Sequence, residues 1–310
     1  MADALSNLLH DVRPRGALFD QSYLRSPWSL RFEERAPLTV ATVLHGEAWI
    51  TADGDMPVAL EPGAVVIVVG AEPYTISDTP DTPAQFVVDD GGRCTGPDGT
   101  VTGAASTVCS HEVEADTSAA LLRGTYQVQG SVCDRVLRGL PRVLVVPASA
   151  VPHNLVDTIV AELARPRAGQ QAVLDRLLDL LLVSGLREWL DRPDSGAPPW
   201  YRAQDDVVVG TALRLMHDDP SHPWTVAALA ERTAVSRATF ARRFTDLVGE
   251  PPMSYLGCWR LCLAADLLRE TDATTDAIAR QVGYADADAL AVAFKRTYGQ
   301  RPALYRRLAL

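Results

Sequence analysis

Short apolar runs separated by turn-forming residues fill the chain from about Trp28 to Val146. Segments such as LTVATVLHG and AVVIVVG are rich in Val, Ile and Thr, and Gly, Pro and Asp interrupt them. Runs of roughly four to eight such residues are typical of β-strands, and the sequence ADGD at 52–55 favours a hairpin turn. The pattern predicts an antiparallel β-sandwich or barrel.

The spacing of apolar residues changes to that of helices near Pro152. Leu155, Ile159 and Leu163 recur at helical spacing, and a longer helix with a broad apolar stripe follows. The stripe consists of Val173, Leu174, Leu177, Leu178, Leu181, Leu182 and Leu186. It is wider than one small sheet needs, so it either packs into a helical subdomain or partly pairs with a second subunit.

The segment RPDSGAPPW at 192–200 concentrates Pro, Gly and Ser, which predicts a linker. After it the chain is helical, and one part repeats another. The shared residues stand 50 positions apart: Phe244 and Phe294, Gly249 and Gly299, Pro252 and Pro302, Tyr255 and Tyr305. Self-similarity at a fixed offset indicates a duplicated structural unit.

Each copy carries the local signals of two helices joined by a turn. In the first copy, Thr225 is expected to cap a short helix and Ser236 a second one. In the second copy, a threonine at 274–275 caps the first helix, Gly283 takes the turn, and another helix covers about 286–298. These signals predict two helix-turn-helix units.

The repeat is where a family resemblance emerges. The stretch AALAERTAVSRATFARRFTDLVGEPPMSYL and the later IARQVGYADADALAVAFKRTYGQRPALYRR closely resemble the DNA-binding domain of the AraC/XylS family, over residues 205–308. The resemblance implies that the helix around 258–269 is a rigid connector between the units. It would hold both recognition helices on one face, in successive major-groove segments about 34 Å apart.

The resemblance also implies which side chains face DNA. In the first unit Phe240, Phe244 and Leu247 take the core-facing stripe, so the opposite side of the helix is free to enter the groove. The residues on or near that side are Ser236, Arg237, Ala238, Thr239, Arg242 and Arg243. Arg242 is the best candidate for a bidentate contact to guanine, and a solvated helix face with incidental arginines is the alternative.

The second unit offers fewer groups for reading bases. Its candidate contacts are Asp288, Val292, Lys295 and Arg296. Acidic side chains repel a phosphate backbone, and the family more often presents polar or basic groups at these places. We therefore expect this helix to contribute mainly positioning through Lys295 and Arg296, or weak apolar readout through Val292.

The net charge of −10 is unevenly distributed. From Trp200 onward 14 Lys and Arg stand against 13 Asp and Glu, whereas the residues before Trp200 hold 15 against 26. Lys and Arg supply much of the affinity for DNA, so the rear part can approach phosphates despite the acidic total. The sequence contains neither a long apolar run nor a signal-peptide pattern, so we expect a cytoplasmic protein that does not engage a membrane.

The front part resembles a cupin-like barrel used for effector binding and dimerisation, on the segments WSLRF, LHGEAWI and LEPGAVVIVVG. A small organic effector is expected in the barrel mouth, lined by some of Arg31, His45, Trp49 and Tyr74. Metal-binding cupins supply two or three histidines and a glutamate, and Tyr74 stands where a histidine is common. We expect neither a metal nor a cofactor.

Two alternatives to a small-molecule-controlled regulator stay open. Cys94 and Cys109 flank a Gly-rich loop that is flexible enough to bring them together, which would suit an oxidant sensor. A cupin-type enzyme with a non-functional helical appendage is the other alternative. No nucleophile elbow, phosphate-binding loop or acid–base pair is recognisable, so we do not expect an enzyme.

The sequence thus predicts an α+β architecture with a cupin-like antiparallel β-barrel at 1–150 and a helical dimerisation or packing region at 151–191. A linker at 192–204 and an all-α domain with two helix-turn-helix units at 205–308 follow. The predicted function is that of a sequence-specific transcription regulator, an activator by family habit and a homodimer. Its expected partners are promoter DNA, a small-molecule effector and RNA polymerase.

Overall fold

The computed structural model describes residues 12–14, 20–90, 93–96, 99, 101–104, 119–128, 137, 139–152, 154–164 and 167–309. The chain divides into two compact units. One, the β unit, contains Arg13–Val128 and Leu140–Gly196, and the other, the helical unit, contains Ala197–Leu310.

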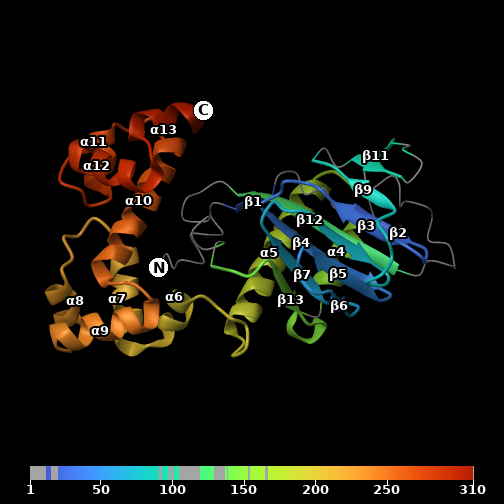
Figure 1. Ribbon diagram of the computed structural model, residues 1–310, viewed down its shortest axis with the longest axis horizontal. Helices are drawn as coiled ribbons and strands as arrows, with labels where there is room; N and C mark the ends of the chain where they lie inside the picture. The colour runs from blue at the N-terminus through green and yellow to red at the C-terminus, as the bar shows by residue number, and fades with distance from the viewer. Residues whose placement is uncertain are drawn as a thin grey trace. The chain divides into compact units, whose positions relative to one another are not determined.

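Two sheets face each other in the β unit (Figure 1). The first has the strand order β1-β12-β4-β7-β13, with β2 also paired to β12, and the second has the order β11-β10-β9-β3-β8-β5-β6. Strands β3 and β9 run parallel, whereas β4 pairs antiparallel with both β7 and β12. The first sheet contains β1 (Val12–Pro14), β2 (Asp20–Leu24), β4 (Leu38–His45), β7 (Val65–Val69), β12 (Ala119–Val128) and β13 (Val143–Val146). The second contains β3 (Ser29–Phe32), β5 (Ala48–Ala52), β6 (Val58–Leu60), β8 (Tyr74–Ser77), β9 (Phe86–Val88), β10 (Arg93–Thr95) and β11 (Val101–Ala104).

The prediction of a closed barrel is wrong, because the two sheets form an open sandwich. Among the described strands, none of one sheet pairs with a strand of the other. A barrel needs continuous hydrogen bonding through its edge strands, and the edge strands β1 and β6 have only three residues each. The two sheets therefore pack face to face.

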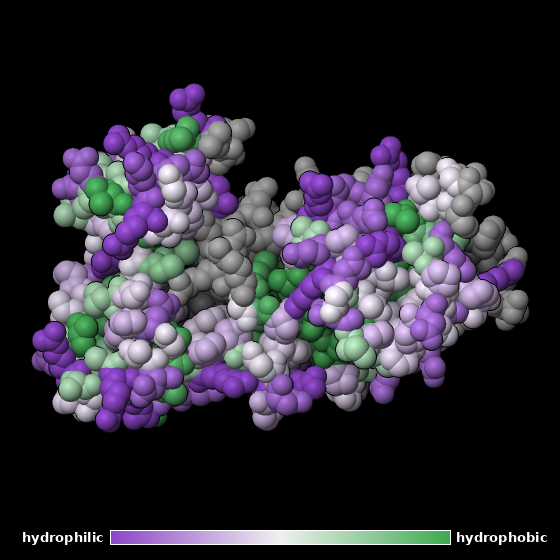
Figure 2. Space-filling model, in the orientation of Figure 1, coloured by the Kyte–Doolittle hydropathy of each residue, from purple (hydrophilic) through white to green (hydrophobic). Residues whose placement is uncertain are grey.

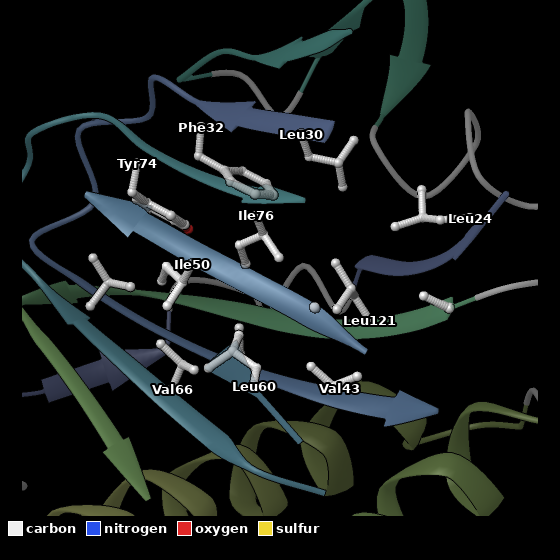
Figure 3. Packing of buried hydrophobic residues seen from close by; sticks show 14 of the residues in the cluster. Leu24, Leu30, Phe32, Val43, Ile50, Leu60, Val66, Tyr74, Ile76 and Leu121 are labelled. Carbon is white, nitrogen blue, oxygen red and sulfur yellow. The ribbon is translucent and has the colours of Figure 1, made fainter. Parts of the chain in front are cut away.

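The hydrophobic core of the β unit lies between the sheets (Figure 3). Strand β5 illustrates how the sequence directs its side chains: Ala48, Ile50 and Ala52 are buried, and Trp49 and Thr51 between them are half-buried on the opposite face. Side chains of both sheets meet in this core, among them Leu30, Phe32, Tyr74, Ile76, Val43, Val66 and Leu121.

Helix α5 (Gln170–Asp191) covers the outer face of the first sheet and pairs with α4 (Leu155–Leu163). A Cβ added at Gly185 of α5 would lie 3.3 Å from Cδ1 of Ile67, and one added at Gly124 would lie 2.3 Å from Cδ2 of Leu178. Helix and sheet thus approach closely where a glycine on one of them faces an apolar side chain of the other. Part of the apolar stripe is therefore buried on the sheet, namely Leu174, Leu178, Leu181, Leu182 and Leu186.

The helical unit consists of consecutive helices joined by short turns (Figure 1). Helix α8 packs against α9, which together form the first helix pair, and α11 packs against α12, which form the second helix pair. The helices are α6 (Pro199–Arg202), α7 (Val207–Asp218), α8 (Val226–Arg232), α9 (Arg237–Val248), α10 (Pro252–Glu270), α11 (Thr275–Gln281), α12 (Ala287–Tyr298) and α13 (Pro302–Ala309).

Helix α10 contributes to two separate cores. Its first turns bring Tyr255 and Leu256 to the core that Phe240 and Phe244 of the first helix pair occupy. Its later turns add Leu261, Ala264, Ala265 and Leu268 to the core of the second helix pair. The expected connector is thus a single helix that begins earlier than predicted, at Pro252.

Candidate nucleic-acid interface

Hydrogen-bonded caps define the first helix pair. Oγ1 of Thr225 accepts a hydrogen bond from the Ala228 N–H at 3.1 Å, and Oγ of Ser236 accepts one from the Thr239 N–H at 3.2 Å. Each cap satisfies a backbone donor that the first turn of a helix leaves without a partner. Ala234 adopts a left-handed conformation with φ 56° in the turn. The predicted caps at Thr225 and Ser236 are confirmed.

Helix α9 has a buried face and an exposed face. Phe240, Phe244 and Val248 are buried in the core of the first helix pair. The exposed face carries Ser236, Arg237, Ala238, Thr239, Arg242 and Arg243. Leu247, which we expected on the core-facing stripe, is 37% exposed, because the helix turns Val248 inward in its place. In Figure 2, hydrophilic and hydrophobic side chains are mixed over α8 and α9.

Arg243 is engaged by another side chain. Its Nη2 lies 2.5 Å from Oδ2 of Asp206, and its Nε lies 3.1 Å from the same atom. Oδ1 of Asp206 caps α7 by accepting from the N–H groups of Val208 at 3.0 Å and Val209 at 2.9 Å. Arg243 therefore ties α9 to α7. Sequence reasoning missed Asp206, although an aspartate directly before an apolar helical run is a cap signal.

The hydrogen bonds to Asp206 lower the pKa of its carboxyl by more than burial raises it. Burial alone raises the pKa of this carboxyl, but the Val209 N–H, the Arg243 guanidinium and the Val208 N–H donate to it and bring its pKa below the ordinary value. The carboxylate is thus held in its charged form. Among the described residues, no ion pair holds Arg237 or Arg242 in this way.

The second helix pair repeats this local construction. Oγ1 of Thr274 accepts from the Ala277 N–H at 3.2 Å, and Oδ1 of Asp286 accepts from the Ala289 N–H at 2.8 Å. Gly283 takes the turn with φ 86°. Of the two threonines proposed as caps, Thr274 is the one that caps α11.

The exposed face of α12 differs from that of α9 in chemistry. It carries Asp288, Val292, Lys295 and Arg296, and Val292 is 74% exposed. An isolated valine on an exposed helix face offers an apolar contact, and the two basic groups beside it offer charge.

The residues expected to line an effector site do not converge. Tyr74 is buried between the sheets, whereas Arg31 and Trp49 stand on the opposite face of the same sheet. His45 is exposed at the end of β4 in the other sheet. Arg31 is engaged by Asp53, with Nη2 and Oδ2 2.7 Å apart, and this contact lowers the pKa of Asp53.

A buried polar cluster that sequence reasoning missed surrounds Tyr74. Nη1 of Arg123 lies 2.5 Å from Oε2 of Glu34, and its guanidinium carbon lies 4.5 Å from the centre of the Phe32 ring. Phe32 stacks on Tyr74 with ring centres 4.9 Å apart, as Figure 3 shows. The Tyr74 hydroxyl is buried beside Thr39 and Arg123, but among the described residues it makes no hydrogen bond of normal geometry; burial raises its pKa more than these two neighbours lower it.

Of the two cysteines proposed as an oxidant sensor, the structure describes one. Cys94 is 1% exposed in the core between the sheets, and Cys109 lies outside the described residues. In the part of the chain that the structure describes, no group of three or more His, Cys, Asp or Glu side chains is arranged to hold a metal ion. No helix in that part is long and apolar enough to cross a membrane.

Comparison with known proteins gives matches to both parts of the chain. A cupin family profile matches residues 3–191, and a helix-turn-helix domain profile matches residues 229–308. A protein of Streptomyces lividans named a putative AraC-like transcription regulator is 32% identical over 311 residues, and a protein of the same name from Streptomyces antibioticus is 32% identical over 312 residues. Each of these alignments covers 98% of both chains. The HTH-type transcriptional regulator AlkR of Acinetobacter baylyi is 35% identical over 151 residues, 48% of each chain.

Proposed function

Because the chain belongs to the AraC-like family of transcription regulators, with a cupin domain before a helix-turn-helix domain, we propose that both helix pairs act as helix-turn-helix units on promoter DNA. Like the two Streptomyces proteins that match its full length, the chain is a DNA-binding regulator. It is not an enzyme. In this proposal α9 and α12 enter successive major-groove segments of one duplex. A cupin enzyme with an inactive helical appendage is therefore no longer favoured.

The exposed face of α9 is the observation that carries the proposal. Arg242 stands on the side of the helix opposite the buried Phe240 and Phe244, and Arg237 is exposed in the first turn of the helix. Arginine presents two parallel N–H donors that match guanine O6 and N7, and one such contact discriminates against a wrong base by about 1–3 kcal/mol. Arg242 is one turn inside the helix, where it can reach a base edge. Ala238 can contact a thymine methyl group.

Helix α12 has a supporting role in this proposal. Lys295 and Arg296 neutralise phosphates, and Val292 contacts a thymine methyl group. Asp288 disfavours close phosphate contact at the beginning of the helix. Arg243 forms an ion pair with Asp206, so its main role is to hold α9 against α7 and not to contact DNA.

Gel-shift titrations with the full chain and the promoter upstream of its own gene test the proposal. Arg242→Ala should lose selectivity for that promoter over random duplex, whereas Lys295→Ala should weaken both complexes equally and flatten their salt dependence. Arg214→Ala, which removes an exposed arginine from α7, is the matched control and should bind as the wild type does. Unchanged selectivity in Arg242→Ala would contradict the assignment.

The effector is expected to bind between the two sheets of the β unit, at Tyr74. The support is its buried hydroxyl without a normal hydrogen bond beside the charged pair of Arg123 and Glu34. A buried polar group whose neighbours are poorly aligned loses part of its hydrogen-bond free energy, and a ligand that bonds to it in good geometry recovers that part. Differential scanning fluorimetry against a metabolite library identifies a binder, and Tyr74→Phe should weaken it; equal affinity in Tyr74→Phe would exclude the hydroxyl.

Dimerisation is expected through the part of α5 that the sheet leaves uncovered. Val173 is 44% exposed and Leu180 50% exposed, and the half-buried Leu177 stands between them on the same side of the helix. These positions are separated by four and three residues, which is the spacing of a helix–helix seam. Sedimentation equilibrium should report a dimer for the wild type and a monomer for Leu180→Glu. A Leu180→Glu dimer of wild-type stability would exclude this seam.

We further expect a cytoplasmic activator that contacts RNA polymerase. A reporter fused to its target promoter, with and without the gene for this chain, distinguishes activation from repression. Oxidant sensing through Cys94 and Cys109 stays a prediction. The burial of Cys94 disfavours it, because oxidants react with accessible thiolates.

A further inference from the structure

Helix α10 is not a uniformly stiff rod. Its Gly257 lies after the residues that belong to the first core, Tyr255 and Leu256, and before Leu261, the first residue of the second core. A Cβ at Gly257 would meet no atom within 4 Å, so no close packing requires glycine there. Glycine inside a helix leaves the backbone freer than alanine does. The helix alone is therefore a weak determinant of how the two helix pairs are oriented.

Arg260, one turn after Gly257, holds the loop that precedes the first helix pair. Its Nε donates to the carbonyl oxygen of Pro220 and its Nη2 to that of His222, each at 2.7 Å. That loop is anchored in the first core, because Trp224 is buried there and its Nε1 donates to the carbonyl oxygen of Asp219 at 2.9 Å. The two carbonyl groups thus fix the direction of the guanidinium.

The turn of the second helix pair rests on the same guanidinium. A Cβ at Gly283 would lie 2.7 Å from Nη2 and 2.8 Å from Cζ of Arg260, and 2.8 Å from the carbonyl oxygen of Pro220. The positive φ of Gly283 allows the backbone to come this close. Three segments far apart in the sequence therefore meet at one point: the loop before α8, the middle of α10, and the turn between α11 and α12.

We propose that Arg260 and Gly283 form a clamp between the two helix pairs, which sets the separation and angle of α9 and α12 and so restricts the protein to one spacing of its two contact sites on DNA. Arg260 is a positioning residue, since the carbonyl groups occupy its guanidinium. The proposal rests on the proposed function, in which both helices read DNA. Without the clamp, the orientation of the second helix pair depends on α10 itself and on the packing of its Trp259 against His217 of α7, with ring centres 4.3 Å apart.

Selection from a random duplex library tests the clamp with the full chain. The wild type should enrich two sequence blocks at one fixed separation, about one helical turn from centre to centre. Arg260→Met, which keeps an unbranched apolar stem, should still enrich the α9 block, with the second block lost or scattered over several separations. The selected site then provides the probe for affinity measurements.

Insertion of two base pairs between the blocks measures the same property. The insertion rotates the second block by roughly 70° about the duplex axis. The wild type should lose at least about ten-fold in affinity, since the second block becomes a mismatched site. Arg260→Met should lose less than about three-fold, because its second helix pair either follows the block or was not engaged.

A matched control lies on the same helix. Arg269 pairs with Asp266, three residues earlier in α10, with Nη2 and Oδ1 2.5 Å apart. Arg269→Met should therefore keep the wild-type spacing. Circular dichroism establishes folding, and if Arg260→Met does not fold, Arg260→Lys takes its place, since lysine keeps the stem and charge but not the paired geometry.

The outcomes separate the clamp from the proposed function. The same single spacing and the same insertion penalty in the Arg260 variant and the wild type would overturn the clamp. A wild type that enriches one block only would also overturn it, because there would be no second site to space. A wild type that enriches no sequence would overturn the proposed function itself, and the clamp with it.

Discussion

Asp206 offers a way to separate the structural and DNA-binding contributions of α9. One carboxylate oxygen caps α7 through two backbone N–H groups, and the other holds Arg243. Loss of a helix N-cap costs about 1 kcal/mol. The ion pair adds at most about 1 kcal/mol, because Arg243 is 47% exposed and solvent screens it. Asp206→Ala should therefore lower the free energy of unfolding by about 1.5–2 kcal/mol.

Asp206→Asn separates the two contributions. Asparagine keeps an oxygen that can cap α7 but loses the charge, so it should cost only about 0.5 kcal/mol. Urea unfolding of both variants and the wild type, followed by tryptophan fluorescence, measures the difference. An asparagine variant as unstable as the alanine variant would refute the reasoning. The asparagine variant should also bind non-specific DNA more tightly, since Arg243 is released towards phosphates.

The effect of pH gives an independent check of the same carboxyl. Its pKa lies below the ordinary value in the folded chain. The stability it contributes is therefore fully present above the unfolded-state pKa of about 3.9 and is lost as the pH falls through the folded-state value. The gap between the wild type and Asp206→Ala should be constant near neutral pH and shrink in acid. A gap that widens in acid would mean that the carboxyl stabilises the fold in its protonated form.

Three further substitutions test the packing. Gly124→Ala should lower the free energy of unfolding by about 1–3 kcal/mol in urea, because its Cβ would lie 2.3 Å from buried Leu178; unchanged stability would mean that α5 moves freely over the sheet. Gly257→Ala should raise the midpoint of thermal unfolding, with a gain of about 0.5–1 kcal/mol, and a loss would reveal a neighbour at that site. Glu34→Gln should cost about 3–5 kcal/mol in urea because it removes the negative charge that pairs with buried Arg123, and a cost below about 1 kcal/mol would show that other groups or water stabilise the charge of Arg123.

The first helix pair was predictable because its signals are local. Thr225 and Ser236 cap their helices as expected, and Gly249 ends α9 in a left-handed conformation with φ 87°. Such capping involves residues only a few positions apart, so the sequence carries it directly. The same holds for Gly283 in the second helix pair.

Contacts between distant segments could not be predicted from the sequence. Asp206 and Arg243 are 37 residues apart, and Arg260 and Pro220 are 40 apart. The arginines of α9 look equivalent along the chain, and only the path of α7 decides that Arg243 is engaged. Closure of the sheets depends on pairing at their edges, which alternation of apolar residues does not specify.

The residues expected at the effector site do not lie together, because alternate residues of a strand point to opposite faces of the sheet. Arg31 pairs in register with Thr75, the neighbour of Tyr74, so Arg31 and Tyr74 project from opposite faces of the sheet. A shift of one residue in register would have placed them together. Arg123 was missed because the sequence does not show that its strand passes between a helix and a second sheet.

In the proposed function, the base contacts and the spacing of the two contact sites have separate physical sources in the helical unit. Basic groups that can reach bases are concentrated on α9, whereas α12 offers Val292 and two basic side chains beside an aspartate. Each of the α12 contacts is weak by itself, because a single apolar or phosphate contact contributes little discrimination. In the proposed function they add to affinity only when α12 enters the groove together with α9. If Arg260 acts as the proposed clamp, the orientation of the second helix pair matters more for DNA binding than the chemistry of its exposed face.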